Sequence, residues 1–245
     1  MRRLAIGDIH GGYRSLLDVL EKAKFNPKKD LLIGVGDYVD GYSQTYEVIE
    51  YLRNLPNFKG CLGNHDAFYL EWANHPDISP QPIWTNQGGL ATLKSYNYKV
   101  NETHRDWLNS LPYYIELDDM LFIHGGYDPT IPINEQAADV LMWDRTLIRD
   151  RLYDYLMGNE GDSIAPYKKV IVGHTQTNAF PYFMNNWVWP DQKEIDMTKP
   201  FHHDGVWDID TGAGWQERLT VMDVDTEEYW QSETTGILYP NEQRN

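Results

Sequence analysis

Cysteine, basic residues and long apolar runs are all scarce in this chain. Among its 245 residues only Cys61 is a cysteine, which excludes an internal disulfide and fits a reducing compartment. No apolar run has the length of a signal peptide or of a membrane span, so we expect a cytoplasmic protein with no membrane partner. Lys and Arg total 21 against 37 Asp and Glu, and the net charge of −16 disfavours binding to a nucleic-acid polymer.

Short apolar runs alternate with amphipathic segments toward the start of the chain. This pattern predicts strands at 4–6, 31–35 and 60–62 and helices at 13–23 and 45–55. Strand, helix and strand in this order are typical of a parallel sheet with right-handed crossovers. Further strands are predicted at 120–123, 169–172, 206–209, 218–224 and 229–231, and further helices at 135–141 and 145–157. We therefore expect an α/β fold and a single domain over residues 1–245.

Two segments depart from this alternation and are predicted to be insertions. Residues 67–115 have a helical and aromatic pattern interrupted by prolines, which indicates a cap beside the sheet, and the second insertion covers about 178–205. Aromatic residues in and beside these segments could stack on a nucleobase: Trp84, Tyr96, Tyr98, Trp187, Trp189 and Trp207. The alternative is that most of these rings build the core of the cap itself.

Five short motifs each follow a predicted strand. They are GDIHG at 7–11, GDYVDG at 36–41, GNHD at 63–66, HGG at 124–126 and GHT at 173–175. Together they supply carboxylate, amide and imidazole groups, the mixture of oxygen and nitrogen donors that a pair of divalent transition ions requires. Ligand sites of α/β sheets gather at the carboxyl ends of the strands, so we expect the five motifs to meet.

The two aspartate-containing motifs suggest carboxylate ligands. Asp8 and His10 flank one residue, so both side chains point to the same side of an extended chain and could bind the same ion. The alternative for such a pair is a hydrogen bond within the turn. Asp37 could bridge two ions through its two oxygens. Asp40 could orient a histidine, or it could instead cap the helix that is expected to begin near Thr45.

The remaining motifs suggest an amide ligand and three imidazoles. The Asn64 carbonyl would bind a cation without adding negative charge that repels a phosphate. Its neighbour His65 diverges from it in a turn and could protonate a leaving oxygen. His124 and His174 each end a strand and could complete the nitrogen ligands of a second ion.

The ordered motifs resemble those of the calcineurin-like metallophosphoesterase superfamily. Within it, the chain is most similar to the serine/threonine phosphoprotein phosphatase branch and its bacterial relatives, including symmetrical diadenosine tetraphosphatases, over about residues 5–224. The resemblance implies a four-layer α/β/β/α sandwich around two divalent metal ions. Manganese is the first candidate, and iron, zinc, cobalt and nickel are the others.

The resemblance also implies roles for individual residues. It implies a ligand set of Asp8, His10 and the bridging Asp37 for the first ion, and of Asn64, His124 and His174 for the second. His65 would then be the general acid, oriented by Asp40. Arg145 would bind the phosphate of a phosphorylated substrate.

Two arginines of this branch are absent here. An arginine typically follows the final aspartate of the second motif, where this chain has Gly41, and bacterial members often have another where it has Leu62. Both would clamp the substrate phosphate through two parallel hydrogen bonds. Another cation, such as Arg14, Lys94 or Arg105, could take over from a loop.

Three hypotheses for function are open. The first is hydrolysis of a phosphomonoester, in a phosphoprotein or a small molecule, by attack of a water that bridges two metal ions. The second is hydrolysis of a phosphoanhydride, in a dinucleoside polyphosphate or a nucleotide. The third is a metal-bound, phosphate-binding scaffold with little catalysis. The retained pair of Asp40 and His65 argues against the third, because a scaffold would not need it.

Overall fold

The strands form two five-stranded mixed sheets in a computed structural model that describes residues 1–183, 195–242 and 244. The first sheet has the order β10-β9-β1-β2-β3 and the second the order β4-β5-β6-β8-β7. The first sheet comprises β1 (Arg3–Ile6), β2 (Leu31–Gly34), β3 (Phe58–Gly60), β9 (Thr220–Asp223) and β10 (Tyr229–Gln231). The second comprises β4 (Tyr114–Leu117), β5 (Met120–Ile123), β6 (Lys169–Val172), β7 (Phe201–His203) and β8 (Val206–Asp208).

Each sheet has a parallel centre with antiparallel strands beside it. In the first, β1 pairs in parallel with β2 and β2 with β3, while β9 runs antiparallel to β1 and to β10. In the second, β5, β6 and β8 are parallel, and β4 and β7 are the antiparallel edges. The carboxyl ends of three parallel strands therefore meet at one edge of each sheet.

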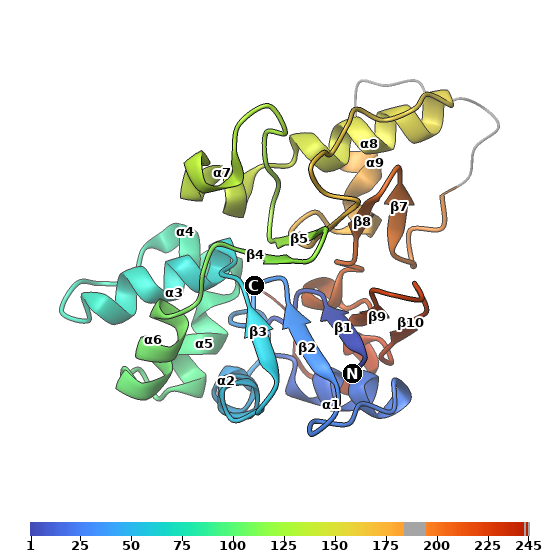
Figure 1. Cartoon of the computed structure of the whole chain (residues 1–245). Helices are drawn as coiled ribbons and strands as arrows, with labels where there is room; N and C mark the ends of the chain where they lie inside the picture. The colour runs from blue at the N-terminus through green and yellow to red at the C-terminus, as the bar shows by residue number, and fades with distance from the viewer. Residues whose placement is uncertain (184–194, 243, 245) are drawn as a thin grey trace.

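Helices cover the outer face of each sheet. In Figure 1, α1 and α2 lie below the first sheet and α8 lies above the second, which gives four layers. The principal helices are α1 (Tyr13–Lys22), α2 (Thr45–Arg53), α3 (Asn64–Asn74), α5 (Leu90–Ser95), α6 (Glu102–Asn109), α7 (Ala138–Trp143) and α8 (Thr146–Met157). The short ones are α4 (Pro82–Trp84), η1 (Thr85–Gly89), η2 (Ile133–Glu135), η3 (Thr177–Ala179), α9 (Phe180–Phe183), η4 (Ala213–Trp215) and α10 (Thr235–Leu238).

The alternation of apolar side chains along the strands sorts them into separate cores. Successive side chains of a strand point to opposite faces. In β1, Leu4 and Ile6 pack against the helices, while Ala5 packs between the sheets. In β5, Leu121 enters the core on the α8 side and Phe122 the core between the sheets. Both sheets are therefore buried on both faces, as the continuous apolar runs require.

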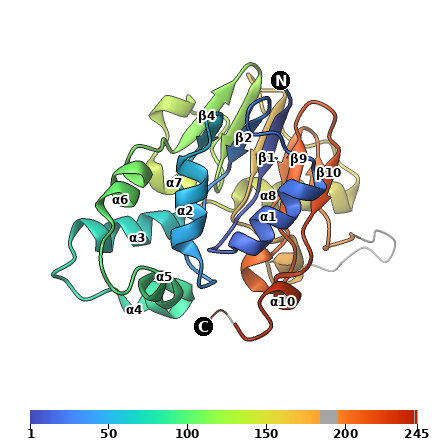
Figure 2. The ribbon, with the colours of Figure 1, turned by 90° about the horizontal axis from the view of Figure 1, so that it is seen from below.

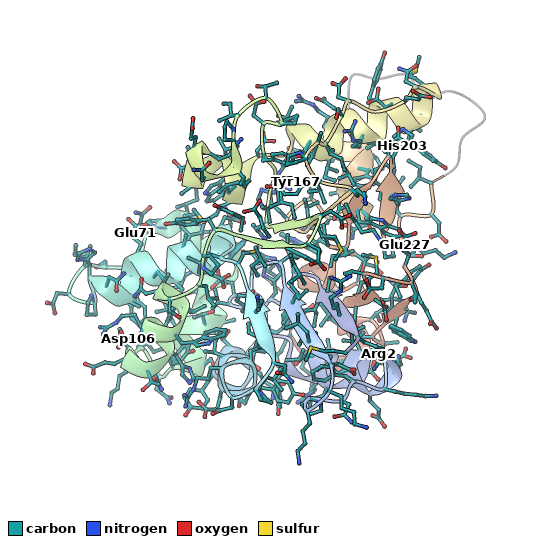
Figure 3. The ribbon with its side chains drawn as sticks, viewed as in Figure 1. Arg2, Glu71, Asp106, Tyr167, His203 and Glu227 are labelled. Atoms are coloured by element: carbon teal, nitrogen blue, oxygen red, sulfur yellow. The ribbon has the colours of Figure 1, made fainter. Side chains whose placement is uncertain are left out.

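The α/β/β/α sandwich expected from the sequence is confirmed by this arrangement. The strands predicted at 120–123, 169–172 and 229–231 have the observed bounds. Residues 64–109 form the helical group α3 to α6 at the side of the first sheet, where Figure 3 labels Glu71 of α3 and Asp106 of α6. In the described part of the chain, no helix is long and apolar enough to cross a membrane.

Four elements differ from the sequence prediction. The strand predicted at 60–62 is β3, which spans Phe58–Gly60 and so ends where the predicted strand begins. The edge strands β4 and β7 were not predicted, because half-exposed edge strands lack the continuous apolar run of a buried one. The helix predicted at 135–141 is divided into η2 and α7. Gln136 interrupts it in an extended conformation, since its side-chain amide donates to the Asp128 and Ile131 carbonyls.

Candidate metal centre

The five motifs converge at the carboxyl ends of the parallel strands of both sheets. Asp8 and His10 follow β1, Asp37 and Asp40 follow β2, and Asn64 and His65 follow β3. His124 follows β5 and His174 follows β6. All eight side chains are buried, none more than 6% exposed. The fold thus brings donors that follow five strands together in one place, as predicted from the motifs.

The first group of donors consists of Asp8, His10 and Asp37. One ligand atom from each lies within 4.8 Å of the other two. His10 Nε2 is 3.9 Å from Asp8 Oδ2 and 3.6 Å from Asp37 Oδ2. The alternative that Asp8 and His10 only stabilise a turn does not account for this convergence with a third residue from another strand.

The second group lies on the other side of Asp37. His124 Nε2 is 3.3 Å from Asp37 Oδ1 and 2.8 Å from Asn64 Oδ1. The His174 ring lies beside that of His124, with 4.9 Å between centroids. The two oxygens of Asp37 therefore face two separate sets of donors, which is the geometry that a bridging carboxylate needs.

The three candidate histidine ligands are held in defined tautomers. The Nδ1–H groups of His10 and His124 donate to the Val39 and Val35 carbonyls, at 3.2 and 2.9 Å. A carbonyl can only accept, so the Nε2 lone pair of each ring faces the cluster. His174 is held the other way round, because its Nε2–H donates to the Trp143 carbonyl at 3.2 Å. Hydrogen bonds of this kind are how proteins orient imidazole ligands to metals.

Two further observations fit divalent cations at this centre. Asp8 Oδ1 is buried and has no hydrogen-bond partner among the described residues. Burial and the charges of Asp210 and Asp37 raise the pKa of Asp8 well above its usual value, and burial raises that of Asp210 to about 6. Crowded, buried carboxylates are costly unless a cation offsets their charge. The donor set and its electrostatics therefore fit a metal centre.

Backbone strain is concentrated in the same residues. His10, Asp37, Asp40 and His174 have φ of 49°, 54°, 71° and 66°. This left-handed conformation costs non-glycine residues on the order of 1 kcal/mol each and persists only where the surroundings enforce it. Strain on four clustered polar residues is typical of a functional site.

Asp66 holds two of the motif loops together. Its carboxylate accepts the backbone N–H of Gly63 and Asp37 at Oδ2, each at 2.9 Å. Its Oδ1 accepts those of Tyr38 and Val39, at 2.9 and 3.3 Å. The sequence motif contained Asp66, but nothing in its spacing indicated this role, which depends on the parallel pairing of β2 and β3.

His65 lies beside the cluster and is oriented by Asp40. His65 Nδ1 is 2.6 Å from Asp40 Oδ2, and the two ring centroids of His65 and His10 are 5.0 Å apart. Asp40 also accepts hydrogen bonds from Trp84 Nε1 at 2.8 Å and Thr92 Oγ1 at 2.9 Å. The alternative assignment of Asp40 as a helix cap is wrong, because the N-cap of α2 is Gln44.

Arg145 approaches the centre from the start of α8. Its Nη1 donates to the His174 carbonyl at 2.6 Å and to Thr175 Oγ1 at 3.1 Å. This places the guanidinium at the His174 side of the cluster. The structure thus places Arg145 close to the candidate ligands, in contact with the backbone carbonyl of one of them.

Two of the three other cations suggested by the sequence are engaged elsewhere. Arg14 donates to the Leu238 carbonyl at 2.7 Å, and Arg105 pairs with Asp106 at 2.8 Å. Lys94 lines an open hollow of about 590 Å³ beside Gly41. The cation that does reach His65 was not identified from the sequence.

That cation is Arg244. Its Nη2 lies 2.8 Å from His65 Nε2, although the two residues are 179 positions apart in the sequence. No motif, spacing or periodicity marks this arginine. Only the path of the folded chain brings it to the centre.

The aromatic residues give a mixed outcome. Trp84, Tyr96 and Trp207 are 1%, 6% and 8% exposed, so they build the core, whereas Tyr98 is 60% exposed. Trp187 and Trp189 lie outside the described residues. An exposed ring beside the centre is that of Trp143, which is 40% exposed and contacts the rings of Phe68 and His174 at 5.3 and 6.1 Å.

Comparisons with known proteins agree with this architecture and site. The family model described as calcineurin-like phosphoesterase matches residues 1–191. The chain belongs to this family, whose members are hydrolases that use divalent metals.

Two curated relatives are similar over most of the chain. The symmetrical bis(5'-nucleosyl)-tetraphosphatase of Neisseria meningitidis is 25% identical over 96% of this chain and 97% of the relative. The serine/threonine-protein phosphatase 2 of Salmonella typhimurium is 31% identical over 71% of this chain and 82% of the relative. A solved metallophosphoesterase from Sphaerobacter thermophilus has the same fold, with a TM-score of 0.57, 19% identity, and coverage of 96% and 89%.

Proposed function

We propose that this protein is a phosphatase that hydrolyses phosphomonoesters of a small molecule or a phosphoprotein with the help of two divalent metal ions. The observation that carries the proposal is the position of Asp37, whose two carboxylate oxygens face different donor groups at 3.6 and 3.3 Å. The comparisons support the proposal as well, because the chain belongs to a family of metal-dependent phosphoesterases.

Two sets of residues would hold the ions. Asp8, His10 and Asp37 would hold the first, and Asp37, Asn64, His124 and His174 the second. Ions bound there would lower the pKa of water and offset charge on the phosphoryl group. Manganese suits this oxygen and nitrogen set, as do iron, zinc, cobalt and nickel.

The remaining residues act on protons and on the phosphate. His65 protonates the leaving oxygen through Nε2, while its Nδ1–H remains on Asp40. Asp40 keeps the ring oriented, and Trp84 and Thr92 fix Asp40 in turn. Arg145 contributes positive charge at the His174 side, where a phosphate oxygen could accept from it.

The proposal includes a cytoplasmic enzyme built as one metallophosphoesterase domain over residues 1–245, with insertions at about 67–115 and 178–205. The support for the location is the single cysteine, which is buried and free, and the acidic composition.

A substrate panel tests this function. The chelated protein is supplied with each candidate metal and assayed with 4-nitrophenyl phosphate, a phosphopeptide and diadenosine tetraphosphate. We expect metal-dependent turnover that Asp37→Asn abolishes and that the surface control Asp106→Asn leaves unchanged. Absence of turnover with every metal and substrate would contradict the proposal and favour a phosphate-binding scaffold.

A second candidate function is cleavage of a dinucleoside polyphosphate or a nucleotide. The observation that favours it is the exposed ring of Trp143, which lies between Phe68 and His174 and could stack on a base. The Neisseria relative bears the name of such an enzyme. If this function holds, Trp143→Ala will raise KM for diadenosine tetraphosphate and leave KM for 4-nitrophenyl phosphate unchanged.

A further inference from the structure

The absence of arginine at positions 41 and 62 leaves the His65 side of the centre without its expected cation. Arg145 approaches at His174, through the carbonyl of that residue. In the transition state of hydrolysis, negative charge is spread over the oxygens of the phosphoryl group. Cations on more than one side of the group stabilise this charge best. A guanidinium near His65 and Gly41 would supply a cation on the His65 side.

The guanidinium of Arg244 occupies this place. Its Nη2 donates to His65 Nε2 at 2.8 Å, and its Nε donates to the Gln87 carbonyl at 3.1 Å. Its Cζ lies 4.7 Å from the centre of the Trp215 ring. Its Nη1 is shielded from solvent and has no hydrogen-bond partner among the described residues. A buried donor without a partner is costly, so this group is suited to a ligand that accepts from it.

Arg244 lies beside the contact between the loops of Gly41 and Gly88. The Gly41 N–H donates to the Gly88 carbonyl at 3.3 Å. A Cβ placed on Gly88 would lie 2.6 Å from the Gly41 nitrogen and 3.2 Å from Arg244 Nε. A Cβ on Gly214 would lie 2.4 Å from His10 Cδ2 and 2.6 Å from Arg244 Nη1. The guanidinium is therefore packed between the loop of Gly41 and the ring of a candidate metal ligand.

The segment after α10 packs against the loop after β2, and this contact positions the Arg244 side chain. Tyr239 stacks on Tyr42 with 4.6 Å between ring centroids. Glu242 accepts hydrogen bonds from the backbone N–H and the hydroxyl of Ser43, both at 2.9 Å. In Figure 2 the red segment that follows α10 runs toward the side of α4 and α5, and its Asn241 and Glu242 line the same hollow as Gly88 and Leu90. The segment thus binds to the same loop that carries Asp40 and Gly41.

We propose that Arg244 is a phosphate-binding residue that takes the place of the arginine missing at Gly41. It binds two oxygens of the substrate phosphate through Nη1 and Nη2, in the bidentate geometry that guanidinium groups favour. When the phosphate binds, the Arg244 donor leaves His65 Nε2 for a phosphate oxygen, and His65 is free to face the leaving group. The inference rests on the proposed function and specifies which side chain of this chain recognises its phosphate.

Binding of inorganic phosphate tests the inference apart from turnover. The Kd of phosphate for the manganese-loaded protein is measured by calorimetry for the native chain, Arg244→Ala, Arg244→Lys and the surface control Arg105→Ala. We expect Arg244→Ala to raise Kd by about 10- to 100-fold, Arg244→Lys to raise it less, and Arg105→Ala to leave it unchanged. An unchanged Kd in Arg244→Ala, with the metal content of the native chain, overturns the inference.

Kinetics separate a phosphate clamp from an inhibitory contact. A residue that binds the phosphate matters equally for good and poor leaving groups, so Arg244→Ala should lose the same factor in kcat/KM on 4-nitrophenyl phosphate and on glycerol 2-phosphate. If Arg244 instead blocks His65, the variant will be more active than the native chain, and the inference is wrong. A native chain with no turnover contradicts the proposed function alone, since phosphate binding still reports on Arg244.

Discussion

His65 Nδ1 lies 2.6 Å from Asp40 Oδ2, although the two residues follow different strands of the first sheet. The contact forms because β2 and β3 are parallel neighbours, so the loops that follow them run side by side. The carboxylate is fully buried and keeps the Nε2 atom of the ring directed away from it, toward Arg244 Nη2. This pair defines the side of the site at which the leaving group is expected.

The first prediction concerns the leaving group. His65→Ala should retain its metals and lose about 10²- to 10⁴-fold in turnover of glycerol 2-phosphate, because a poor leaving group needs a proton. The loss on 4-nitrophenyl phosphate should be much smaller. Metal content by mass spectrometry and steady-state kinetics on both substrates measure this. Equal losses on the two substrates would show that His65 does not protonate the leaving oxygen.

The second prediction concerns Asp40 as a positioning residue. Asp40→Asn should reduce kcat on glycerol 2-phosphate through His65 alone, so adding it to His65→Ala should cause no further loss. Thr92→Val, which removes one donor to Asp40 at nearly constant volume, should show a smaller reduction. The double variant is the decisive measurement. Additive losses would mean that Asp40 acts independently of His65.

The third prediction concerns stability. Asp66 accepts hydrogen bonds from four backbone N–H groups. In Asp66→Asn, the side-chain NH₂ group would face two of them and could not accept their hydrogen bonds. Leaving buried donors unpaired should lower the free energy of unfolding by about 3 kcal/mol, measured in urea. The exposed Asp106→Asn is the matched control and should change it by about 0.5 kcal/mol or less. A change in the free energy of unfolding as small as that of the control would show that Asp66 does not hold the two loops together.

The fourth prediction concerns pH and metal removal. Burial raises the pKa of Asp66 to about 8 and that of Asp210 to about 6 in the metal-free protein. Groups whose pKa is higher in the folded than in the unfolded state bind more protons when folded, so the stability that they contribute falls as pH rises from about 4 to about 8. Burial lowers the pKa of His10 and His174, which gives the opposite slope, and we expect the more numerous buried carboxyl groups to outweigh it. Bound cations stabilise the carboxylate forms and should oppose this loss.

Melting temperatures measure this effect. The difference in Tm between the manganese-loaded and the chelated protein should be larger at about pH 8 than at about pH 5, by about 5 °C. Part of any increase reflects tighter metal binding at higher pH, so the chelated protein must itself lose stability with rising pH. A chelated protein that becomes more stable over this range would contradict the prediction.

Much of the fold was predictable because it depends on local periodicity. Buried central strands such as β5 and β6 are short apolar runs that end at a polar motif, and their bounds were predicted correctly. Edge strands were not predictable in this way. Tyr114 and Glu116 of β4 are partly or fully exposed, so its sequence carries no strong pattern, and only pairing with β5 makes it a strand.

The sequence by itself determined which donors are available and that each follows a strand, because strand ends and turn residues are encoded within a few positions. Tertiary structure decided which donors meet. The contact of Asp40 with His65, that of Trp84 with Asp40 and that of Arg244 with His65 all join residues far apart in the chain. Such contacts depend on how the two sheets and the segment after α10 pack, which no local pattern records.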